Sequence, residues 1–316
     1  MIIIVEHDSL INNHKCDNKT VTTYHWIYNM FKYLIDKHEF KQIEKDDIYN
    51  NVHNLDNYFL KNFNVIPSFI ILFNKFELVS KIYKKKCSSN IIVIIDDIHH
   101  SQRIKTIQNK AFKNCKYILS TYSYVFNEYF GYSNNKIVNF NHSGAYDIEY
   151  NESPLNKILL VGHVNSSLYP DRAKFYDLSR TNSNIVVIHP PKYIQSENRG
   201  FVGYEFAKLI NNYVCTFCDD SVRKYIVSKF FEIPCYGSLL LACNEQTKNE
   251  FEKLGFVDNI NYISCNNTNW DDKINFILDD KNRTIVNQIR LRGYLLATSK
   301  HSYYNRANVI VDLVKK

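Results

Sequence analysis

The sequence predicts an α/β protein built from two doubly wound parallel-sheet domains and a helical C-terminal segment. Three observations support this fold class: short apolar runs alternate with helical patterns, the runs are continuous rather than alternating, and a polar stretch divides them into two similar groups. Continuous apolar runs are typical of strands that are buried on both faces, as in parallel sheets. Strands that alternate with helices indicate βαβ units.

The predicted strands are short runs rich in Ile, Leu, Val, Phe and Tyr. They cover residues 2–5, 68–73, 91–95, 117–120 and 137–140 in the first half of the chain, and residues 158–161, 185–188, 213–217, 238–242 and 262–264 in the second. From Trp270 onward the pattern is helical, and residues 279–282 separate one helix from a second that runs to the C-terminus.

A polar stretch at residues 146–156 (YDIEYNESPLN) lacks apolar periodicity and contains Pro154, so it is predicted to link the two domains. We therefore expect an N-terminal domain at residues 1–150 and a C-terminal domain at residues 151–316. Ligands of open α/β sheets bind beyond the carboxyl ends of the strands. Two such sheets that face each other predict a ligand-binding cleft between the domains.

The composition is that of an ordinary globular protein, with 45% hydrophobic and 22% charged residues over 316 positions. A chain of this length is long enough for two domains that each bury a core. The N-terminus (MIIIVEHDSL) is apolar for too few residues to form a signal peptide, and no run approaches the ~18 apolar residues of a spanning helix. We expect a cytoplasmic protein without an integral membrane segment.

Cysteine content and charge argue against several classes of function. The eight cysteines are scattered through a chain that shows no signal peptide, which is typical of reduced core residues. Cys215 and Cys218 form a C-x-x-C within an apolar run but lack the second pair of a zinc site, so no metal is expected. The formal charge of +7 suits an anionic ligand. The aromatic residues are spread evenly rather than interleaved with arginines, so nucleic-acid binding is not expected.

Residues 218–242 combine the end of a strand, a helix and the start of the next strand. Asp219, Asp220 and Ser221 are candidates for the helix N-cap, and the helix is predicted to run to about Pro234. Its polar residues recur at helical spacing and form one stripe: Tyr225, Ser228, Lys229 and Glu232. The stripe is either a solvent-exposed face or the lining of a cleft beside a phosphate-binding helix N-terminus. Spacing alone favours the solvent-exposed face.

Several motifs occur in an order that resembles a known family. They are Lys229-Phe230-Phe231-Glu232 with Gly237-Ser238-Leu239-Leu240-Leu241, the closing His301-Ser302-Tyr303-Tyr304-Asn305-Arg306, and Asn141-His142-Ser143-Gly144 with Ile158-Leu159-Leu160-Val161-Gly162. The order resembles group 1 glycosyltransferases and is more similar still to the CgeB-like, spore-protein glycosyltransferase branch. The resemblance covers about residues 90–316. It implies a GT-B fold, in which two Rossmann-like domains face a cleft, and a metal-independent transfer from a nucleotide-sugar donor.

In the family that the sequence resembles, the glutamate that matches Glu232 accepts hydrogen bonds from the ribose hydroxyls of the nucleotide. A carboxylate suits this role because it accepts from two vicinal hydroxyls at once. Lys224 stands where many group 1 enzymes have a second acidic residue. This departure argues against sugar recognition by that position and favours phosphate contact by Arg223 or Lys224. The further candidates for nucleotide binding in these motifs are Gly162, Ser221, Ser228 and Lys229.

A diphosphate leaving group that is not held by a metal needs cations and helix-terminal N–H groups. Arg172 and Lys174 follow the first strand of the second domain and are candidates for this contact, with the cations of residues 223–229 as rivals. A solvated first helical turn explains Arg172 and Lys174 equally well. His189 and Tyr193 follow a buried strand, where they either hold the nucleobase or belong to an ordinary turn.

The acceptor is expected on the first domain. Asp97 and His99 follow its strongest predicted strand, and either residue can act as the general base of an inverting transferase. A helix N-cap beside an exposed histidine explains the same residues without a catalytic role. His7 with Asp8, after the first strand, and His142, near the end of the domain, are further candidates.

Together these patterns predict a glycosyltransferase that moves a sugar from a nucleotide-diphosphate sugar to a hydroxyl of a glycan, a protein or a small molecule. No cofactor is expected apart from this donor, and a homodimer is left open. A non-catalytic GT-B module that binds glycan or nucleotide is the alternative. A basic nucleic-acid-binding α/β protein is less favoured. A dinucleotide-dependent dehydrogenase is disfavoured because no G-x-G-x-x-G follows an early strand.

Overall fold

The computed structural model describes residues 1–5, 25–99, 102–130, 136–189 and 203–316. The chain divides into two compact units. Unit 1 takes its described residues from Met1–Cys16, Ile27–Asn141 and Ala307–Lys316, and unit 2 takes its described residues from Asp17–Trp26 and His142–Arg306. The last residues of the chain thus belong to unit 1.

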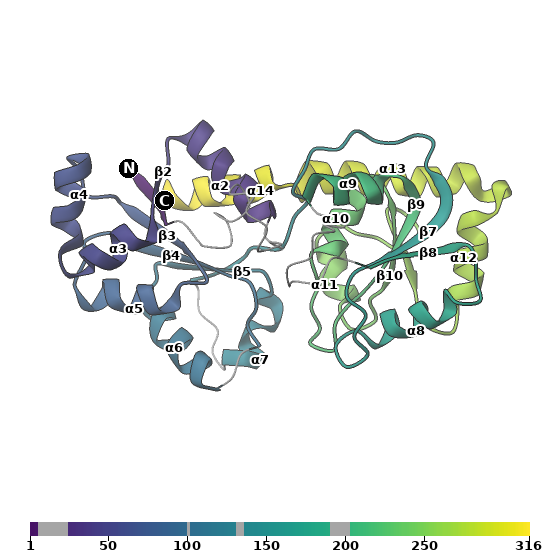
Figure 1. Ribbon diagram of the computed structural model, residues 1–316, viewed down its shortest axis with the longest axis horizontal. Helices are drawn as coiled ribbons and strands as arrows, with labels where there is room; N and C mark the ends of the chain where they lie inside the picture. The colour runs from purple at the N-terminus through teal and green to yellow at the C-terminus, as the bar shows by residue number, and fades with distance from the viewer. Residues whose placement is uncertain (6–24, 100–101, 131–135, 190–202) are drawn as a thin grey trace. The chain divides into compact units, whose positions relative to one another are not determined.

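Unit 1 contains a six-stranded parallel sheet in the order β2-β1-β3-β4-β5-β6 (Figure 1). Its strands are β1 (Ile2–Val5), β2 (Lys41–Ile43), β3 (Phe69–Phe73), β4 (Asn90–Ile95), β5 (Tyr117–Ser120) and β6 (Ile137–Asn139). The helical segments between them are α2 (His25–His38), α3 (Lys45–Asn51), η1 (Val52–Asn54), α4 (Leu55–Phe63), α5 (Phe76–Lys84), α6 (Gln102–Phe112), η2 (Ser123–Val125) and α7 (Phe126–Phe130). Only β2 was not predicted, because this edge strand exposes Lys41 and Gln42 and buries Ile43 alone.

Unit 2 contains a five-stranded parallel sheet in the order β11-β10-β9-β7-β8 (Figure 1). Its strands are β7 (Leu155–Val161), β8 (Ile185–Ile188), β9 (Tyr213–Asp219), β10 (Leu239–Cys243) and β11 (Ile263–Cys265). Its helical segments are α8 (Pro170–Leu178), α9 (Gly203–Asn211), α10 (Lys229–Cys235), α11 (Lys248–Lys253), α12 (Trp270–Leu278), η3 (Asp280–Asn282) and α13 (Arg283–Lys300). The final helix, α14 (Tyr303–Val314), continues from unit 2 into unit 1.

The predicted fold class is confirmed, since each unit is built around a parallel sheet with helices between its strands. Every run that the sequence analysis assigned to a strand lies in one of these strands or overlaps it closely. Among the described residues, no helix is both long enough and apolar enough to cross a membrane.

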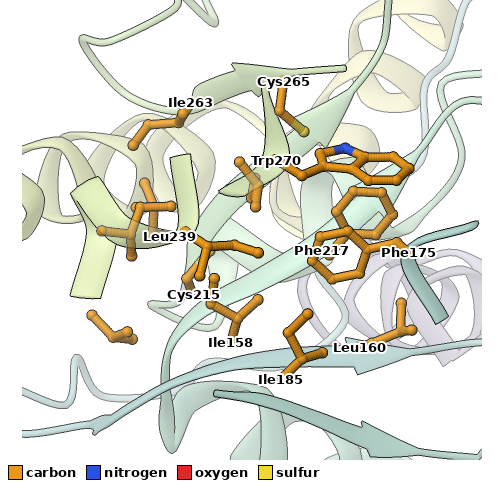
Figure 2. Packing of buried hydrophobic residues seen from close by; sticks show 14 of the residues in the cluster. Ile158, Leu160, Phe175, Ile185, Cys215, Phe217, Leu239, Ile263, Cys265 and Trp270 are labelled. Carbon is orange, nitrogen blue, oxygen red and sulfur yellow. The ribbon is translucent and has the colours of Figure 1, made fainter. Parts of the chain in front are cut away.

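The core of unit 2 fills one face of its sheet with large side chains from β7 and β9 and from two helices. Phe175 of α8 stacks on Phe217 of β9, with ring centroids 3.9 Å apart. Trp270 of α12 stands edge-on to both rings, and Figure 2 shows these three aromatic side chains grouped together. Because side chains alternate along a strand, Cys215 joins this face while Cys218 points to the other. The two thiols of the C-x-x-C therefore do not share a site.

The predicted final helix is interrupted at His301 and Ser302, between α13 and α14. Gly144 forms an isolated parallel bridge with Ser302 at this point. The Gly144 N–H donates to the His301 carbonyl oxygen at 3.1 Å, and the Tyr303 N–H donates to the Gly144 carbonyl oxygen at 3.1 Å. The helix breaks here because the His301 carbonyl oxygen and the Tyr303 N–H bond to Gly144 instead of to backbone groups of their own helix.

His301 and Arg306 of the closing motif are buried on either side of this break. The His301 Nε2 atom lies 3.0 Å from the Leu254 carbonyl oxygen, so it must carry a proton. The Nδ1 atom then accepts a hydrogen bond from Arg306 Nη2 at 3.1 Å, which requires a neutral ring. Burial, together with the positive charge of Arg306, lowers the pKa of His301 to about 4.

Acid should therefore destabilise the protein through His301. Because its pKa falls from 6.5 to about 4 on folding, the unfolded chain takes up the proton first as the pH declines. We expect wild type to lose about 2–3 kcal/mol of unfolding free energy between about pH 7 and about pH 4.5 relative to His301→Gln. The glutamine amide can donate to Leu254 and accept from Arg306 without titrating. Urea denaturation across this range measures the difference, and parallel pH profiles for the two proteins would contradict it.

Candidate functional site

The sheet of unit 2 has one point at which its strand order reverses, between β7 and β9. The chain leaves β7 through α8 toward β8, on one side, and leaves β9 through α10 toward β10, on the other. Because such connections are right-handed, their helices cover opposite faces of the sheet. Ligands of doubly wound sheets bind at this reversal, beyond the carboxyl ends of the strands. A ligand site is therefore expected at the loops that follow β7 and β9.

Two cations from different helices meet at Gly162, directly after β7. Gly162 has a φ of +115°, which favours glycine. A Cβ atom added here would lie 3.0 Å from Arg172 Nη1 and 3.1 Å from Lys229 Cε. Arg172 belongs to α8 and Lys229 is the first residue of α10. The structure thus brings together three residues that the sequence analysis named separately.

Arg172 is anchored by a buried ion pair with Asp219, the last residue of β9. The Nη2 and Oδ1 atoms are 2.6 Å apart and the Arg172 N–H donates to Oδ2 at 2.9 Å. Burial alone would lower the pKa of Arg172, but the Asp219 carboxylate, together with Cys218 and Tyr169, outweighs it and the pKa is raised. Burial also raises the pKa of Asp219, although Arg172 opposes that change. Arg172 Nη1 also donates to the His163 carbonyl oxygen at 3.2 Å, on the loop after β7.

Glu232 lies one turn into α10 and is half-buried. The Ser228 hydroxyl donates to Glu232 Oε2 at 3.4 Å, and the Glu232 N–H donates to the Ser228 carbonyl oxygen at 3.0 Å. Burial raises the pKa of Glu232, while Lys229, His142 and the Ser228 hydroxyl each oppose the rise. A carboxylate that retains acceptor capacity therefore lies on the same short helix as the cation of Lys229.

The predicted helix over residues 221–234 is shorter than expected, because α10 begins only at Lys229. Asp219 and Asp220 do not cap it. Asp220 instead accepts hydrogen bonds from the Gln246 N–H and the Thr247 hydroxyl, both at 3.2 Å. Burial raises the pKa of Asp220 to about 7, against the effect of the Thr247 hydrogen bond. From the sequence, Asp220 is recognisable only as a candidate for a helix cap, because its hydrogen-bond partners follow the next strand, β10.

The predicted polar stripe of Tyr225, Ser228, Lys229 and Glu232 does not form, because α10 is shorter than the helix that it required. Tyr225 is buried and precedes α10, so it shares no helical face with Glu232. Ser221 is buried, and its Oγ accepts from the Arg223 N–H at 3.3 Å while its carbonyl oxygen accepts from the Lys224 N–H at 2.8 Å. These bonds make a tight turn in which Lys224 adopts a φ of +58°. The turn competes with the helix and delays its start.

For three other candidates, the structure describes no contact with Gly162, Arg172 or Lys229. Lys174 lies on the exposed side of α8. His189 is exposed, and its ring meets the edge of the Tyr176 ring with centroids 5.7 Å apart. Tyr193 lies outside the described residues. Phosphate contact by Lys174 and nucleobase contact by His189 and Tyr193 stay predictions.

The acceptor-side candidates Asp97 and His99 follow β4 in unit 1, as predicted. The His99 Nδ1 and Asp97 Oδ1 atoms are 3.5 Å apart, and both side chains are partly exposed. The neighbouring Asp96 is buried, and its Oδ1 accepts from the Thr121 hydroxyl at 3.0 Å. His7 and Asp8, after β1, lie outside the described residues. In the part of the chain that the structure describes, no group of His, Cys, Asp or Glu side chains is arranged to hold a metal ion.

Solved structures share the fold of this chain at low sequence identity. Anabaena HepE, crystallised with UDP and glucose, is 10% identical with a TM-score of 0.65, over 100% of this chain and 99% of that one. A glycosyltransferase from Rickettsia africae is 12% identical with a TM-score of 0.62, over 99% and 97%. A putative UDP-N-acetylglucosamine 2-epimerase from Listeria monocytogenes is 11% identical with a TM-score of 0.57, over 99% and 95%.

These likenesses confirm the GT-B fold, and they extend over whole chains. Neither a protein-family model nor the sequence of a curated protein matches this chain. The fold is therefore established by similarity to solved structures and not by sequence similarity.

The buried ion pair gives a prediction for stability. Asp219→Asn leaves the Arg172 charge uncompensated, and we expect it to lower the unfolding free energy by about 3 kcal/mol. The double variant Arg172→Met/Asp219→Leu should recover most of this loss, because it removes both charges and keeps the volume. Asp177→Asn, in the exposed pair with Arg180, is the control and should cost less than about 1 kcal/mol. Urea denaturation would refute this account if all three proteins unfolded alike.

Proposed function

We propose that this protein is a glycosyltransferase that uses a nucleotide-diphosphate sugar as its donor. The observation that carries the proposal is the convergence of Gly162, Arg172 and Lys229 at the strand-order reversal of unit 2, with Glu232 three residues after Lys229 on the same short helix. Such a reversal is where doubly wound sheets bind nucleotides. Cations and a carboxylate at this edge match the two chemical parts of a nucleoside diphosphate, its phosphates and its ribose.

The cations would stabilise the diphosphate as it leaves. Cleavage of the sugar–phosphate bond builds negative charge on the diphosphate, and fixed positive groups stabilise that charge as it develops. Lys229 and Arg172 both approach Gly162, where the missing Cβ leaves room for their side chains. Two cations at this point support a reaction without a metal ion, as in the family that the motifs resemble.

Glu232 would bind the ribose. An ionised carboxylate accepts hydrogen bonds only, and its two oxygens can accept from two neighbouring hydroxyls. The Ser228 hydroxyl already donates to Oε2, which orients the carboxylate for a ligand. The order of Glu232 and its neighbours along the chain is also what supports placement in the CgeB-like branch.

In an inverting reaction, the acceptor hydroxyl would lose its proton to a general base as it attacks the anomeric carbon and the nucleoside diphosphate leaves. Asp97 and His99 of unit 1 are the proposed source of this base, because they form a partly exposed pair directly after β4. The acceptor is a hydroxyl compound, either a glycan, a protein or a small molecule.

The solved structures of similar fold support the proposal in its general form. HepE was crystallised with UDP and glucose and with UDP-glucose. The similar fold of a putative UDP-N-acetylglucosamine 2-epimerase favours a second candidate, in which the same nucleotide site serves an epimerase. A binding module without catalytic activity is the third. All three would hold a nucleotide at the same edge of unit 2.

One set of assays separates the three candidates. The purified chain is first screened for thermal stabilisation by UDP, GDP, ADP and TDP, because a ligand of the native state stabilises it by mass action. The matching nucleotide sugar is then incubated with a panel of hydroxyl acceptors. A transferase releases nucleoside diphosphate and extends an acceptor, an epimerase changes the sugar stereochemistry, and a binding module does neither. Absence of stabilisation by every nucleotide would overturn the proposal.

Replacement of Glu232 tests the ribose contact. Glu232→Gln keeps the side-chain shape but removes the charge, so we expect nucleotide affinity to fall about 10-fold to 100-fold. The fold should stay intact, because burial raises the pKa of Glu232 and its ionised form therefore costs the folded state free energy at neutral pH. Isothermal titration calorimetry measures the affinity, and Glu205→Gln, on the exposed face of α9, is the control. Wild-type affinity in Glu232→Gln would show that the ribose site is elsewhere.

A further inference from the structure

The two cations that meet at Gly162 differ in their charge partners. Arg172 is paired with Asp219 at 2.6 Å, so its positive charge has a direct counterion in the interior. Among the residues that the structure describes, no carboxylate lies within ion-pair distance of the half-buried Lys229 ammonium. The charge of Lys229 acts on Glu232 only from beyond that distance. Lys229 therefore supplies the positive charge at this edge of the sheet that is not neutralised by a direct partner.

The Lys229 ammonium lies over an aromatic ring. Its Nζ atom is 5.7 Å from the centroid of the Phe206 ring, which is within the distance at which an aromatic face attracts a cation. Phe206 is half-buried on α9, and α9 contacts α10, which begins at Lys229. The Lys229 side chain thus passes Gly162 at its Cε atom and ends over a ring instead of at a carboxylate.

The first turn of α9, which carries Phe206, is fixed by close packing. A Cβ atom added to Gly203, which has a φ of +58°, would lie 3.0 Å from Tyr146 Oη and 3.3 Å from His25 Cε1. Tyr146 Oη and His25 Nδ1 are 2.9 Å apart, so these two side chains form a hydrogen-bonded pair beside the helix. Phe206 follows Gly203 by three residues and lies on the same face of α9. All of these residues belong to unit 2.

We propose that Phe206 is a positioning residue that holds the Lys229 ammonium for a diphosphate, and that Lys229 supplies more of the binding charge than Arg172 does. The proposal rests on the proposed function in one respect, since it takes the ligand to be the diphosphate of a nucleotide. It deepens that function because it distinguishes the cation that binds the diphosphate from the cation that is neutralised within the fold.

An aromatic ring suits this role because it leaves the ammonium available to a ligand. A carboxylate partner accepts a hydrogen bond from the ammonium and cancels its charge, so a phosphate would have to displace it. The negative face of a ring attracts the cation and leaves its three N–H donors for phosphate oxygens. Lys208 and Lys253 of the same unit show the other arrangement, because their Nζ atoms lie 2.9 and 2.6 Å from Glu205 and Glu250.

A cycle of variants tests whether Phe206 acts through Lys229. UDP affinity is measured by isothermal titration calorimetry on the full-length chain. Lys229→Met should bind UDP about 10-fold to 100-fold more weakly, because it loses charge-assisted hydrogen bonds. Phe206→Leu should weaken binding about twofold to fivefold, as a cation–π contact implies, but should have no effect in the Lys229→Met background. Phe206→Tyr keeps the aromatic face and should match wild type. Equal losses from Phe206→Leu in both backgrounds would show a merely structural role.

Fluorinated phenylalanines separate the charge distribution of the ring from its shape. Fluorine withdraws electron density from the ring face, so phenylalanines with one, two and three fluorine atoms at position 206 should bind UDP progressively more weakly. Phe276 is the matched control, because it is half-buried on α12 and the structure describes no cation over its ring. The same series at Phe276 should leave UDP affinity unchanged. Affinity that does not vary with fluorine number at position 206 would overturn the positioning role.

Two comparisons test the assignment of the charge to Lys229. Uridine lacks the phosphates, so Lys229→Met should lose affinity for UDP and keep the wild-type affinity for uridine. The double variant Arg172→Met/Asp219→Leu should weaken UDP binding less than Lys229→Met does, because it removes a pair of charges that cancel. Lys208→Met, on the exposed side of α9, is the control and should bind UDP like wild type. An equal or larger loss in the double variant would overturn the assignment.

The outcomes separate this proposal from the proposed function. If UDP binds to wild type but fluorination and Phe206→Leu have no effect, the positioning role is overturned and the nucleotide site stands. If wild type binds no UDP, the role in diphosphate binding is overturned. Urea denaturation of the same variants then shows whether the contact itself exists, as a coupling of about twofold to fivefold in the unfolding equilibrium constant. Should Phe206→Leu fail to fold by circular dichroism, the fluorinated proteins decide the result.

Discussion

The buried ion pair between Arg172 and Asp219 is the interaction on which the candidate site depends. It joins the first turn of α8, which follows β7, to the end of β9, so it spans the point at which the strand order reverses. The pair also aims the Arg172 guanidinium at Gly162 and at the loop after β7. A buried arginine of this kind is held by its charge partner, because either charge alone would be costly in the interior. The pair therefore fixes the position of the Arg172 guanidinium beside Gly162.

A second set of contacts fixes α10, which is too short to be stable through its own hydrogen bonds. The helix contains Pro234, and its place is decided by what packs on it. Gly144 and Ala145 contact its C-terminal end, and His301 and Tyr303 hydrogen-bond in turn to Gly144. The motif segments at residues 141–144, 229–241 and 301–306 thus contact one another in the structure.

Much of the fold follows from local patterns that the sequence displays openly. Parallel strands buried on both faces must be apolar throughout, so β1, β3 and the strands that follow were predicted. The edge strand β2 has one buried residue, so its sequence carries no such pattern. The helix predicted over residues 221–228 does not form, for a different reason. Asp219 and Asp220 have the residue type of helix caps, but their carboxylates bond to Arg172, Gln246 and Thr247, which lie far away in sequence.

The sequence by itself determined the two-sheet α/β architecture, and it singled out the segment that contains Glu232 as the candidate nucleotide site. These properties depend on neighbouring residues and their spacing. Only the tertiary structure decided that Arg172 and Lys229 meet at Gly162, and that Asp220 bonds to Gln246 and Thr247. Such encounters depend on the order of strands in a sheet and on the path of a returning chain. Glu232 accordingly changes from one member of a predicted polar stripe to a residue in the first turn of a short helix, because α10 begins at Lys229 and not at Ser221.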